Sequence, residues 1–348
     1  MINVDWFQPY KHTVYSVGVI YLSILNLPRS LRFKRKNILL IGIIPGPSEP
    51  KHNINSFLDS LVDELANFWK GITFKIRKGS SVFNQLVRCA LLCCSCDLPA
   101  GRKVCGFLGH SDNLGCSKCL KLFPGSVGKK NYSGFDRPTW TPRKNNVHRE
   151  NVECILSCNT AAQQKMKETE FGCRYSALLR LPYLDPPRML VIDLIHNLFL
   201  GSGKHMLHLR IQHGLIHYQP IQQWVDDMIV PSDVRRISHK IASGFSGFPA
   251  DQYTNWITIF AIPCLYETLP DEHLQCWRYF VLACKILCKY SLTKDDIAIA
   301  DGLLIRFSKQ VEELYGTSTV TPNLHLHGHL KDGLLDYGSV YEFWLFSF

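Results

Sequence analysis

The most constraining feature of the sequence is a mainly apolar run that ends in a carboxylate. Residues 86–97 read LVRCALLCCSCD, and Asp97 closes the run. A continuous apolar stretch of this kind is typical of a β-strand buried on both faces. The run therefore predicts a buried strand that delivers Asp97 to its end.

Three further strands are predicted before this run. Residues 2–7, 13–27 and 37–47 are rich in β-branched and aromatic side chains and are separated by turn residues. Because the connections are short, we expect an antiparallel meander. The second run is longer than an average strand, so a twist or bulge at Gly18 is expected.

A helix is predicted between the meander and the apolar run. Residues 54–70 carry apolar side chains at helical spacing, with Asn53 or Asn55 as the start and Gly71 as the stop. Residues 75–81, KIRKGSS, are interpreted as a polar hinge. The resulting order β-β-β-α-β, with an acidic residue in the first strand and another closing the fourth, is the order of a ribonuclease-H-like fold.

Beyond Cys119 the sequence predicts few strands. Residues 121–175 are polar and rich in Pro and Gly, which indicates a long loop. Helical periodicity follows after Pro187 and in residues 232–243, 251–269, 273–291 and 295–316. We expect a mixed α/β chain with three parts: the first part of a ribonuclease-H-like core (1–120), a mainly helical insertion (121–320) and a histidine-containing segment with a last core helix (321–348).

Composition narrows the class of protein. Hydrophobic residues at 46% and charged residues at 20% are typical of a globular protein, and the net charge of +10 suits a polyanionic partner such as nucleic acid. The N-terminus has no signal-peptide pattern, so we expect the 14 cysteines to be reduced thiols. No apolar stretch is long enough for a membrane helix. These features favour cytosol or nucleus.

Asp5 and Asp97 are candidates for a shared metal site. Both are predicted to lie in or at the end of strands, although they are far apart in the sequence. Carboxylates from neighbouring strands can hold hard divalent ions such as Mg²⁺, which prefer oxygen ligands. Two such ions support in-line displacement at phosphorus. The alternative is that each is an ordinary solvated aspartate of a turn.

Cys116 and Cys119 have the spacing of half a tetrahedral zinc site. His325, His327 and His329 could supply the other half. A helix would place His325 and His329 on one face with His327 turned away, whereas a strand would place all three on one face. Two alternatives remain open: a pair of buried thiols that binds no metal, and a metallo-hydrolase HxH pair, which lacks the usual following Asp-His.

Two other groups are functional candidates. Asp193 and His196 are three residues apart, so a helix places them on one side, where they could take part in proton transfer, phosphate positioning or a structural hydrogen bond. The loop 28–36 carries five cations that suit a phosphate backbone or a solvated hairpin tip. These cations are Arg29, Arg32, Lys34, Arg35 and Lys36.

Several blocks together resemble the transposase domain of CACTA (En/Spm-type) DNA transposons. The blocks are spread over nearly the whole chain. They read INVDWFQPYKHTVYSVGVIYLSILNLP, NILLIGIIPGP, CDLPAGRKVCGFLGHSDNLGCSKC, LPYLDPPRMLVIDLIHNLFLG, and TPNLHLHGHL followed by YGSVYEFWLFSF. The resemblance implies a DDE recombinase with a ribonuclease-H-like core, an inserted helical region and DNA as substrate.

The resemblance also implies roles for individual residues. Asp5 and Asp97 match the first two catalytic acids, which bind Mg²⁺ or Mn²⁺. The Cys116–Cys119 motif matches the family CxxC, and His325 and His329 match the histidine pair that completes a structural Zn²⁺ site. Asp193 and His196 match the DxxH motif of the insertion, which supports the active site.

One departure from the family pattern concerns the third acid. In the family the last block continues as Phe-x-Phe-Glu, whereas this sequence stops at Phe348, and Glu342 falls on the wrong position of the motif. The expectation is an incomplete or decayed transposase of the nucleus, homo-oligomeric when active. The alternative is a non-catalytic, zinc-stabilised protein that binds DNA or a partner; an in-frame Glu codon beyond Phe348 would favour the enzyme.

Overall fold

The computed structural model describes residues 1–50, 54–230, 241, 245 and 248–343 of the chain. Two compact units are present. Within the described residues, unit 1 comprises 1–130 and 140–191, and unit 2 comprises 131–139 and 192–343. Unit 1 contains both sheets, and unit 2 is helical in its described part.

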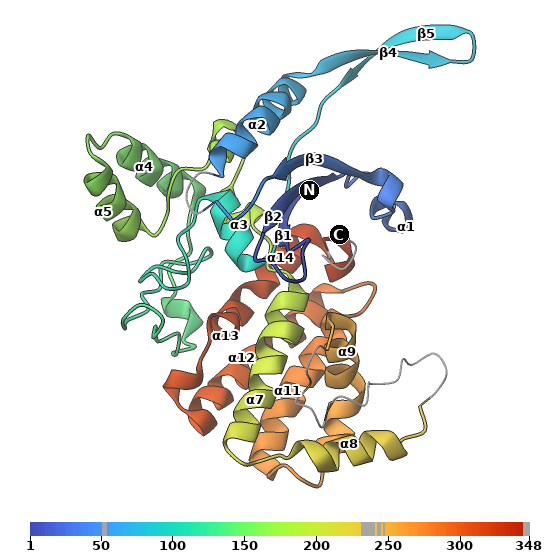
Figure 1. Ribbon diagram of the computed structural model, residues 1–348, viewed down its shortest axis with the longest axis vertical. Coiled ribbons are helices and arrows are strands. Elements are labelled where there is room, and N and C mark those ends of the chain that lie inside the picture. Colours follow the sequence, from blue (N-terminus) through green and yellow to red (C-terminus); the bar gives the residue numbers. More distant parts are fainter. Residues whose placement is uncertain (51–53, 231–240, 242–244, 246–247, 344–348) are drawn as a thin grey trace. The chain divides into compact units, whose positions relative to one another are not determined.

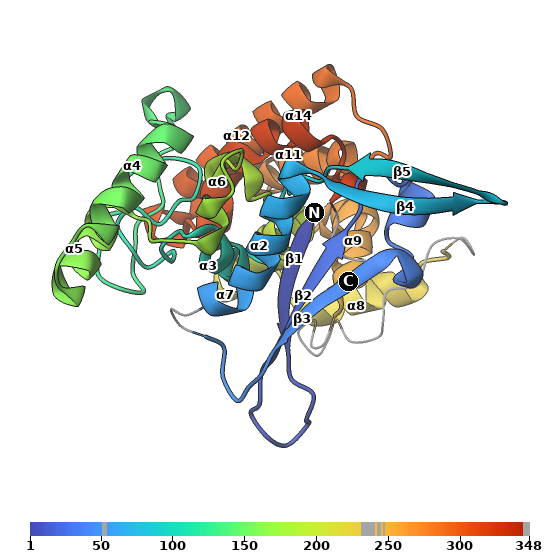
Figure 2. The same ribbon diagram turned by 90° about the horizontal axis from the view of Figure 1, so that it is seen from above.

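The predicted meander is confirmed in unit 1. Strands β1 (Ile2–Phe7), β2 (Val17–Ser23) and β3 (Ile38–Ile44) form an antiparallel sheet in the order β1-β2-β3 (Figure 2). The irregularity in register lies between Ile20 and Tyr21 instead of at Gly18. Gly18 is needed for another reason, since a Cβ there would lie 2.9 Å from the Trp6 indole nitrogen.

The predicted helix is also confirmed. Helix α2 (Asn55–Lys70) begins at Asn55 and ends at Gly71, which has a φ of +111°. Asn53, the other predicted start, lies outside the described residues. One face of α2 is buried, as the helical spacing of its apolar residues requires.

The continuous buried strand predicted over residues 86–97 is wrong. Strand β5 (Ser81–Val87) ends at the start of this run and pairs with β4 (Ile72–Lys78) as an exposed hairpin, so KIRKGSS is part of a hairpin and not a hinge (Figure 1). Further along, only Cys94 forms β-bridges, one with Ile2 and one with Leu190. The apolar run is divided because its first part extends the hairpin and its last part enters the core.

The long loop predicted over residues 121–175 is interrupted by helices. Helices α4 (Asn145–Leu156) and α5 (Ala161–Phe171) occupy much of it. Thr160 caps α5 by accepting a hydrogen bond from Gln163 N, and Gly172 ends it in the left-handed region. The pattern Thr-x-x-Gln followed by a glycine was a readable start and stop signal.

The remaining helices of unit 1 are short. They are α1 (Arg29–Arg32), α3 (Leu98–Cys105), α6 (Pro186–Met189) and the 3-10 turns Arg35–Asn37 and Ala177–Arg180. The core of unit 1 lies between the sheet, α2, α3 and the chain around Leu190. Close packing of α3 needs Gly101, where a Cβ would lie 2.4 Å from a Leu190 methyl carbon.

Unit 2 consists of helices in its described residues. A π-helical segment (Ile195–Gly203) continues into α7, and a second one (Trp256–Phe260) joins α9 to α10. The α-helices are α7 (Lys204–Gln212), α8 (Tyr218–Asp227), α9 (Ala250–Asn255), α10 (Ala261–Leu265), α11 (Asp271–Leu287), α12 (Lys294–Tyr315), α13 (Pro322–Leu326) and α14 (Leu330–Tyr337). The 3-10 turns are Arg137–Thr139, Thr317–Thr319, His327–His329 and Val340–Glu342.

Most of the helices predicted for this region are present. The helix predicted over residues 232–243 falls outside the described residues except for Ile241, which is in a turn. Helices α11 and α12 pack side by side (Figure 1). The rings of Trp277, Phe280 and Phe307 are buried between them. Among the described helices, none has both the length and the apolar character needed to cross a membrane.

Candidate catalytic and metal-binding sites

The chain just before Asp97 runs parallel to β1. Ile2 N donates a hydrogen bond to Cys93 O (3.0 Å), and Ser95 N donates to Ile2 O (2.9 Å). Two residues further along, Val4 N donates to the Cys96 sulfur (3.1 Å). The segment 93–96 therefore lies beside β1 over residues 2–4, although only Cys94 meets the pairing pattern of a strand.

This register brings the two predicted acids to the same end of neighbouring segments. Asp5 follows Val4 and Asp97 follows Cys96, and Val4 and Cys96 are in contact. Asp5 is exposed and Asp97 is half-buried. Asp5 and Asp97, which are far apart in the sequence, thus lie at one edge of unit 1. Water and a ligand can reach the Asp5 carboxylate there.

Each carboxylate has one oxygen engaged by its own backbone. Asp5 Oδ1 accepts a hydrogen bond from Trp6 N (2.8 Å). Asp97 Oδ1 accepts one from Ala100 N (2.7 Å), because Asp97 is the N-cap of α3. These bonds fix both side chains in orientation, and carboxylate oxygens are ligands that a hard cation prefers.

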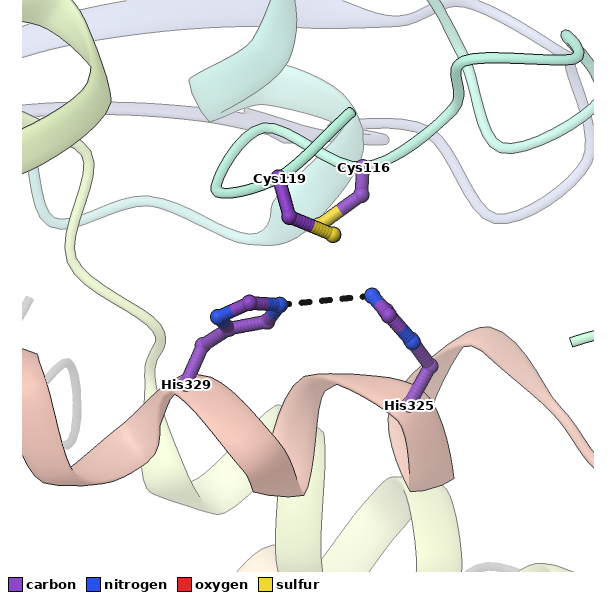
Figure 3. A group of neighbouring side chains, drawn as sticks. All are labelled: Cys116, Cys119, His325 and His329. Atoms are coloured by element: carbon purple, nitrogen blue, oxygen red, sulfur yellow. Dashed lines mark hydrogen bonds between the residues drawn. The ribbon is translucent and has the colours of Figure 1, made fainter. Parts of the chain in front are cut away.

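Cys116 and Cys119 form a compact pair in a loop of unit 1. Both are buried, their sulfurs lie within 4.8 Å of each other, and Figure 3 shows the two sulfurs side by side. Lys118 N donates a hydrogen bond to the Cys116 sulfur (3.3 Å). A backbone N–H directed at sulfur favours a thiolate, which is the form that binds a metal. The adjacent Cys116 thiol, and then burial, raise the pKa of Cys119.

Arg143 holds the loop that carries these thiols. Its guanidinium is buried and donates hydrogen bonds to Cys116 O (2.8 Å), Leu114 O (3.0 Å) and Phe171 O (3.1 Å). Its backbone N–H donates to Lys118 O (2.9 Å). Arg143 was not predicted as a site residue. The local sequence contains no signal for an arginine that donates hydrogen bonds to backbone carbonyls of a distant loop.

His325 and His329 form a second pair, in unit 2. They lie on successive turns of a helix that runs through α13 and the 3-10 turn His327–His329. Figure 3 shows their rings facing each other, with the two Nε2 atoms 3.3 Å apart. Both side chains are buried, so the pair is a preformed set of two nitrogen donors.

His327 is occupied by other partners. Its Nε2 lies 2.9 Å from Ser202 Oγ and its Nδ1 lies 3.1 Å from Ser308 Oγ. The ring is fully buried between these hydroxyls. Of the two arrangements considered for HLHGH, the helical one is present, with His327 turned away from the other two histidines.

Asp193 and His196 are in contact in unit 2. Asp193 Oδ2 accepts a hydrogen bond from His196 N (2.9 Å) and lies 2.8 Å from His196 Nδ1. The carboxylate is buried, and the imidazole is half exposed. Asp193 thus binds the backbone N–H of His196 in the π-helical segment Ile195–Gly203 and also orients the His196 ring at the surface of the unit.

The helical segment that follows Asp193 packs against the helix that carries the histidine pair. Asn197 Nδ2 donates a hydrogen bond to Asn323 O (3.1 Å), and a Cβ at Gly201 would lie 2.3 Å from Asn323 Nδ2. The Ser202–His327 contact joins the same two segments. Asp193 and His325 therefore belong to one packed part of unit 2.

The basic loop 28–36 has mixed roles. Arg32 is buried, and its guanidinium donates hydrogen bonds to Leu25 O (2.7 Å) and Leu27 O (3.3 Å), so it supports the loop. Arg29 is half-buried. Lys34, Arg35 and Lys36 are exposed and are available to an anionic partner.

The comparisons with known proteins agree with part of this description. Residues 1–152 match a family model described as Transposase family tnp2. This matched segment contains Asp5, Asp97 and the Cys116–Cys119 pair. No curated protein matches the chain. The match supports a relationship of residues 1–152 to a transposase family.

Proposed function

We propose that the chain is the DDE transposase domain of a CACTA-type DNA transposon, with a ribonuclease-H-like core. In this proposal Asp5 and Asp97 are two of the acidic ligands of the catalytic metal site. The supporting observation is the parallel register of β1 and the segment 93–96, which brings both acids to one edge of unit 1. The family match over residues 1–152 covers the same segment.

The residues at this edge fit a divalent metal. Asp5 and Asp97 offer carboxylate oxygens, which suit Mg²⁺ or Mn²⁺, and their backbone hydrogen bonds fix both side chains. When bound, such ions activate the attacking oxygen and stabilise the leaving oxygen at a phosphate. The protein side chains hold the ions and orient the DNA backbone. Further acid ligands would complete the site.

A structural zinc ion is the second part of the proposal. Cys116 and Cys119 supply two sulfur donors, and His325 and His329 supply two nitrogen donors. Four such donors complete a closed tetrahedral site, and neither pair is sufficient alone. Arg143 would set the position of the thiol loop, and the Ser202 and Ser308 contacts of His327 would set the helix of the histidines.

The supporting roles and the partners follow from this function. Asp193 orients His196, which we propose as a positioning residue of the DNA site. The substrates are the DNA ends of the transposon and the target DNA. Lys34, Arg35 and Lys36 contact the phosphates of this DNA. The active form is a homo-oligomer in the nucleus.

The test is a DNA strand-cleavage and strand-transfer assay with Mg²⁺ or Mn²⁺ on the full transposase that contains this chain. Asp5→Asn and Asp97→Asn should each lower the rate by at least about 100-fold, since each weakens the binding of ions that act at the reacting phosphate. Glu64→Gln is the matched control, because Glu64 is an exposed carboxylate of α2.

The outcomes separate an enzyme from a binding protein. Full cleavage by both aspartate variants would overturn the acid assignment. DNA binding by the wild-type protein without any cleavage would favour the non-catalytic alternative. Loss of cleavage in the aspartate variants, with unchanged DNA binding and an active Glu64→Gln control, is the result that the proposal predicts.

A further inference from the structure

The β4–β5 hairpin is an exposed two-stranded ribbon in unit 1. Every residue from Thr73 to Leu86 is exposed. The two strands are joined by Gly79 and Ser80, and Gly79 has a φ of +63°, as a tight hairpin turn requires. Both views show the ribbon extending beyond the end of α2 (Figures 1 and 2).

The base of the ribbon is anchored to α2. Cys89 N donates a hydrogen bond to Phe68 O (3.2 Å), and the rings of Phe68 and Phe74 are stacked with centroids 6.2 Å apart. The strands directly follow the C-terminal end of α2 at Gly71. The ribbon is therefore held at its base while its outer part has both faces in solvent.

The two faces of the ribbon differ in chemistry. Paired residues of an antiparallel ribbon lie on the same face, and the face alternates along each strand. Phe74 pairs with Gln85, and Ile76 pairs with Phe83. This face is mainly apolar.

The opposite face carries the basic residues Lys75 and Arg77 among polar and apolar neighbours. On this face Thr73 pairs with Leu86, Lys75 with Asn84, and Arg77 with Val82. The surrounding sequence from Lys70 to Cys96 contains no aspartate or glutamate. It contains the cations Lys70, Lys75, Arg77, Lys78 and Arg88. An exposed strip of uncompensated positive charge attracts a polyanion.

We propose that this ribbon is a DNA-binding arm whose Lys75 and Arg77 contact phosphates of double-stranded DNA. This inference rests on the proposed function and adds a DNA contact outside the acid site and the basic loop 28–36. A β-ribbon fits the major groove of B-DNA, which is about 12 Å wide. The seven residues of β4 span about 23 Å, so the arm is long enough to cross the groove and reach the backbone beside it.

Charge favours DNA over a second copy of the chain as the occupant. Two copies meeting through this ribbon would bring like charges together, in a protein with a net charge of +10. An isolated two-stranded hairpin is only marginally stable in water, so binding of its basic face to DNA also supplies a stabilising partner.

The test is binding of a random-sequence DNA duplex, measured by fluorescence anisotropy in EDTA at a series of salt concentrations. The variant Lys75→Ser/Arg77→Ser removes two charges from the polar face. The control Lys129→Ser/Lys165→Ser removes two charges from exposed positions elsewhere in unit 1. Arg77→Lys tests whether charge at this position is sufficient.

The arm predicts a reduced salt dependence in the first variant. Its slope of log affinity against log salt should fall by about 1.8, and its affinity roughly 10- to 30-fold at about 0.15 M salt. The control should keep the wild-type slope, and Arg77→Lys should stay near it. An unchanged slope in Lys75→Ser/Arg77→Ser would overturn the arm and leave the proposed function in place.

Two further outcomes identify other failures. A wild-type protein that does not bind DNA would overturn the proposed function, and the arm with it. The variant Phe74→Ser/Phe83→Ser changes the apolar face; if it dissociates a dimer in sedimentation while the Lys75/Arg77 variant binds DNA normally, the ribbon is an interface between copies of the chain and the proposal is wrong.

Discussion

Arg143 and His148 lie near each other in the sequence, and both have buried side chains in unit 1. The Arg143 guanidinium donates hydrogen bonds to four backbone carbonyls, two in the Cys116–Cys119 loop region and two at the end of α5. His148 packs its ring on Phe107, with centroids 5.0 Å apart, and neither ring nitrogen has a hydrogen-bond partner within the described part of the chain. Arg143 thus connects backbone segments through hydrogen bonds, whereas His148 packs as a neutral, apolar side chain.

Replacing Arg143 should destabilise the thiol loop. Arg143→Met keeps the aliphatic length but leaves buried carbonyls, including Cys116 O, without a donor, so we expect a loss of about 2 to 4 kcal/mol in the free energy of unfolding. Denaturant unfolding measures this loss. Lys144→Met, at an exposed neighbouring position, should change it by less than about 0.5 kcal/mol. Equal stability of both variants would contradict the role given to Arg143.

His148 should make unfolding depend on pH. Burial, and then the charges of Arg143 and Arg149, lower the pKa of His148 from 6.5 to about 4. The unfolded chain binds the proton more readily, so stability is fully present above about pH 6.5 and falls as the pH drops toward 4, by up to about 3 kcal/mol. In His148→Leu this part of the decline should be absent.

The measurement is the free energy of unfolding of wild type and His148→Leu between pH 7 and about pH 4. The difference between the two proteins isolates His148 from other groups that titrate. His217→Leu, which changes an exposed histidine, should follow the wild-type curve. Parallel curves for wild type and His148→Leu would show that His148 is not responsible.

At the level of single residues, the sequence predicted which side chains could act as ligands better than it predicted the contacts that those side chains make. The CxxC and HxxxH spacings located two donor pairs, and the helical reading of HLHGH turned His327 away from the others, as the structure has it. The contact of Val4 with Cys96, which sets the positions of Asp5 and Asp97, is between distant residues and has no local signal. Arg143 and His148 were missed for the same reason.

At the level of elements, periodic segments were predictable and divided ones were not. The meander, α2, α11 and α12 follow from regular patterns of apolar residues. The run 86–97 looked like one strand, because composition does not show where a chain leaves a hairpin and enters a core. The hairpin itself had a signal in Gly79-Ser80 between alternating residues.

Two glycines with open surroundings should respond in opposite ways to alanine. A Cβ at Gly302, in α12, or at Gly79, in the hairpin turn, meets nothing within 4 Å. Gly302→Ala should stabilise the protein by about 0.5 to 1 kcal/mol, because glycine is a poor helix former. Gly79→Ala should weaken the hairpin by about 1 kcal/mol, because φ is +63° there.

Hydrogen exchange separates the two effects. Gly79→Ala should speed exchange in β4 and β5 and leave α12 unchanged, whereas Gly302→Ala should slow exchange in α12 alone. Faster exchange throughout unit 1 in Gly79→Ala would contradict the description of the ribbon as anchored only at its base.

At the level of the whole molecule, the proposed zinc ion would join segments that are distant in the sequence. The Cys116–Cys119 loop and the His325–His329 helix come from different units. Donor type alone made His325, His327 and His329 candidates for the other half of the site, and the family resemblance named His325 and His329, since metal-ligand spacing identifies each half and not its partner. The ribonuclease-H-like core likewise depends on the family resemblance, because only the meander and α2 follow directly from the local pattern of apolar residues.

Zinc should be bound and should contribute to stability. We expect about one zinc ion per chain, and chelation should lower the midpoint of thermal unfolding, because binding energy is part of folding energy at such sites. Cys116→Ser and His329→Ala should each lose the metal. Cys158→Ser, at a half-buried thiol outside the site, should keep it. Folded wild-type protein without zinc in elemental analysis would contradict the zinc site.

The most direct test of the central claim, that Asp5 and Asp97 share a divalent-metal site, is cleavage of the polypeptide by bound Fe²⁺ with hydrogen peroxide and ascorbate. Hydroxyl radicals formed at a site held by both residues should cut the chain near residue 5 and near residue 97 in the same sample. Mg²⁺ should suppress both cuts, Asp5→Asn or Asp97→Asn should remove both, and Glu64→Gln should change neither. Cuts at only one position, or cuts that persist in both aspartate variants, would contradict a shared site.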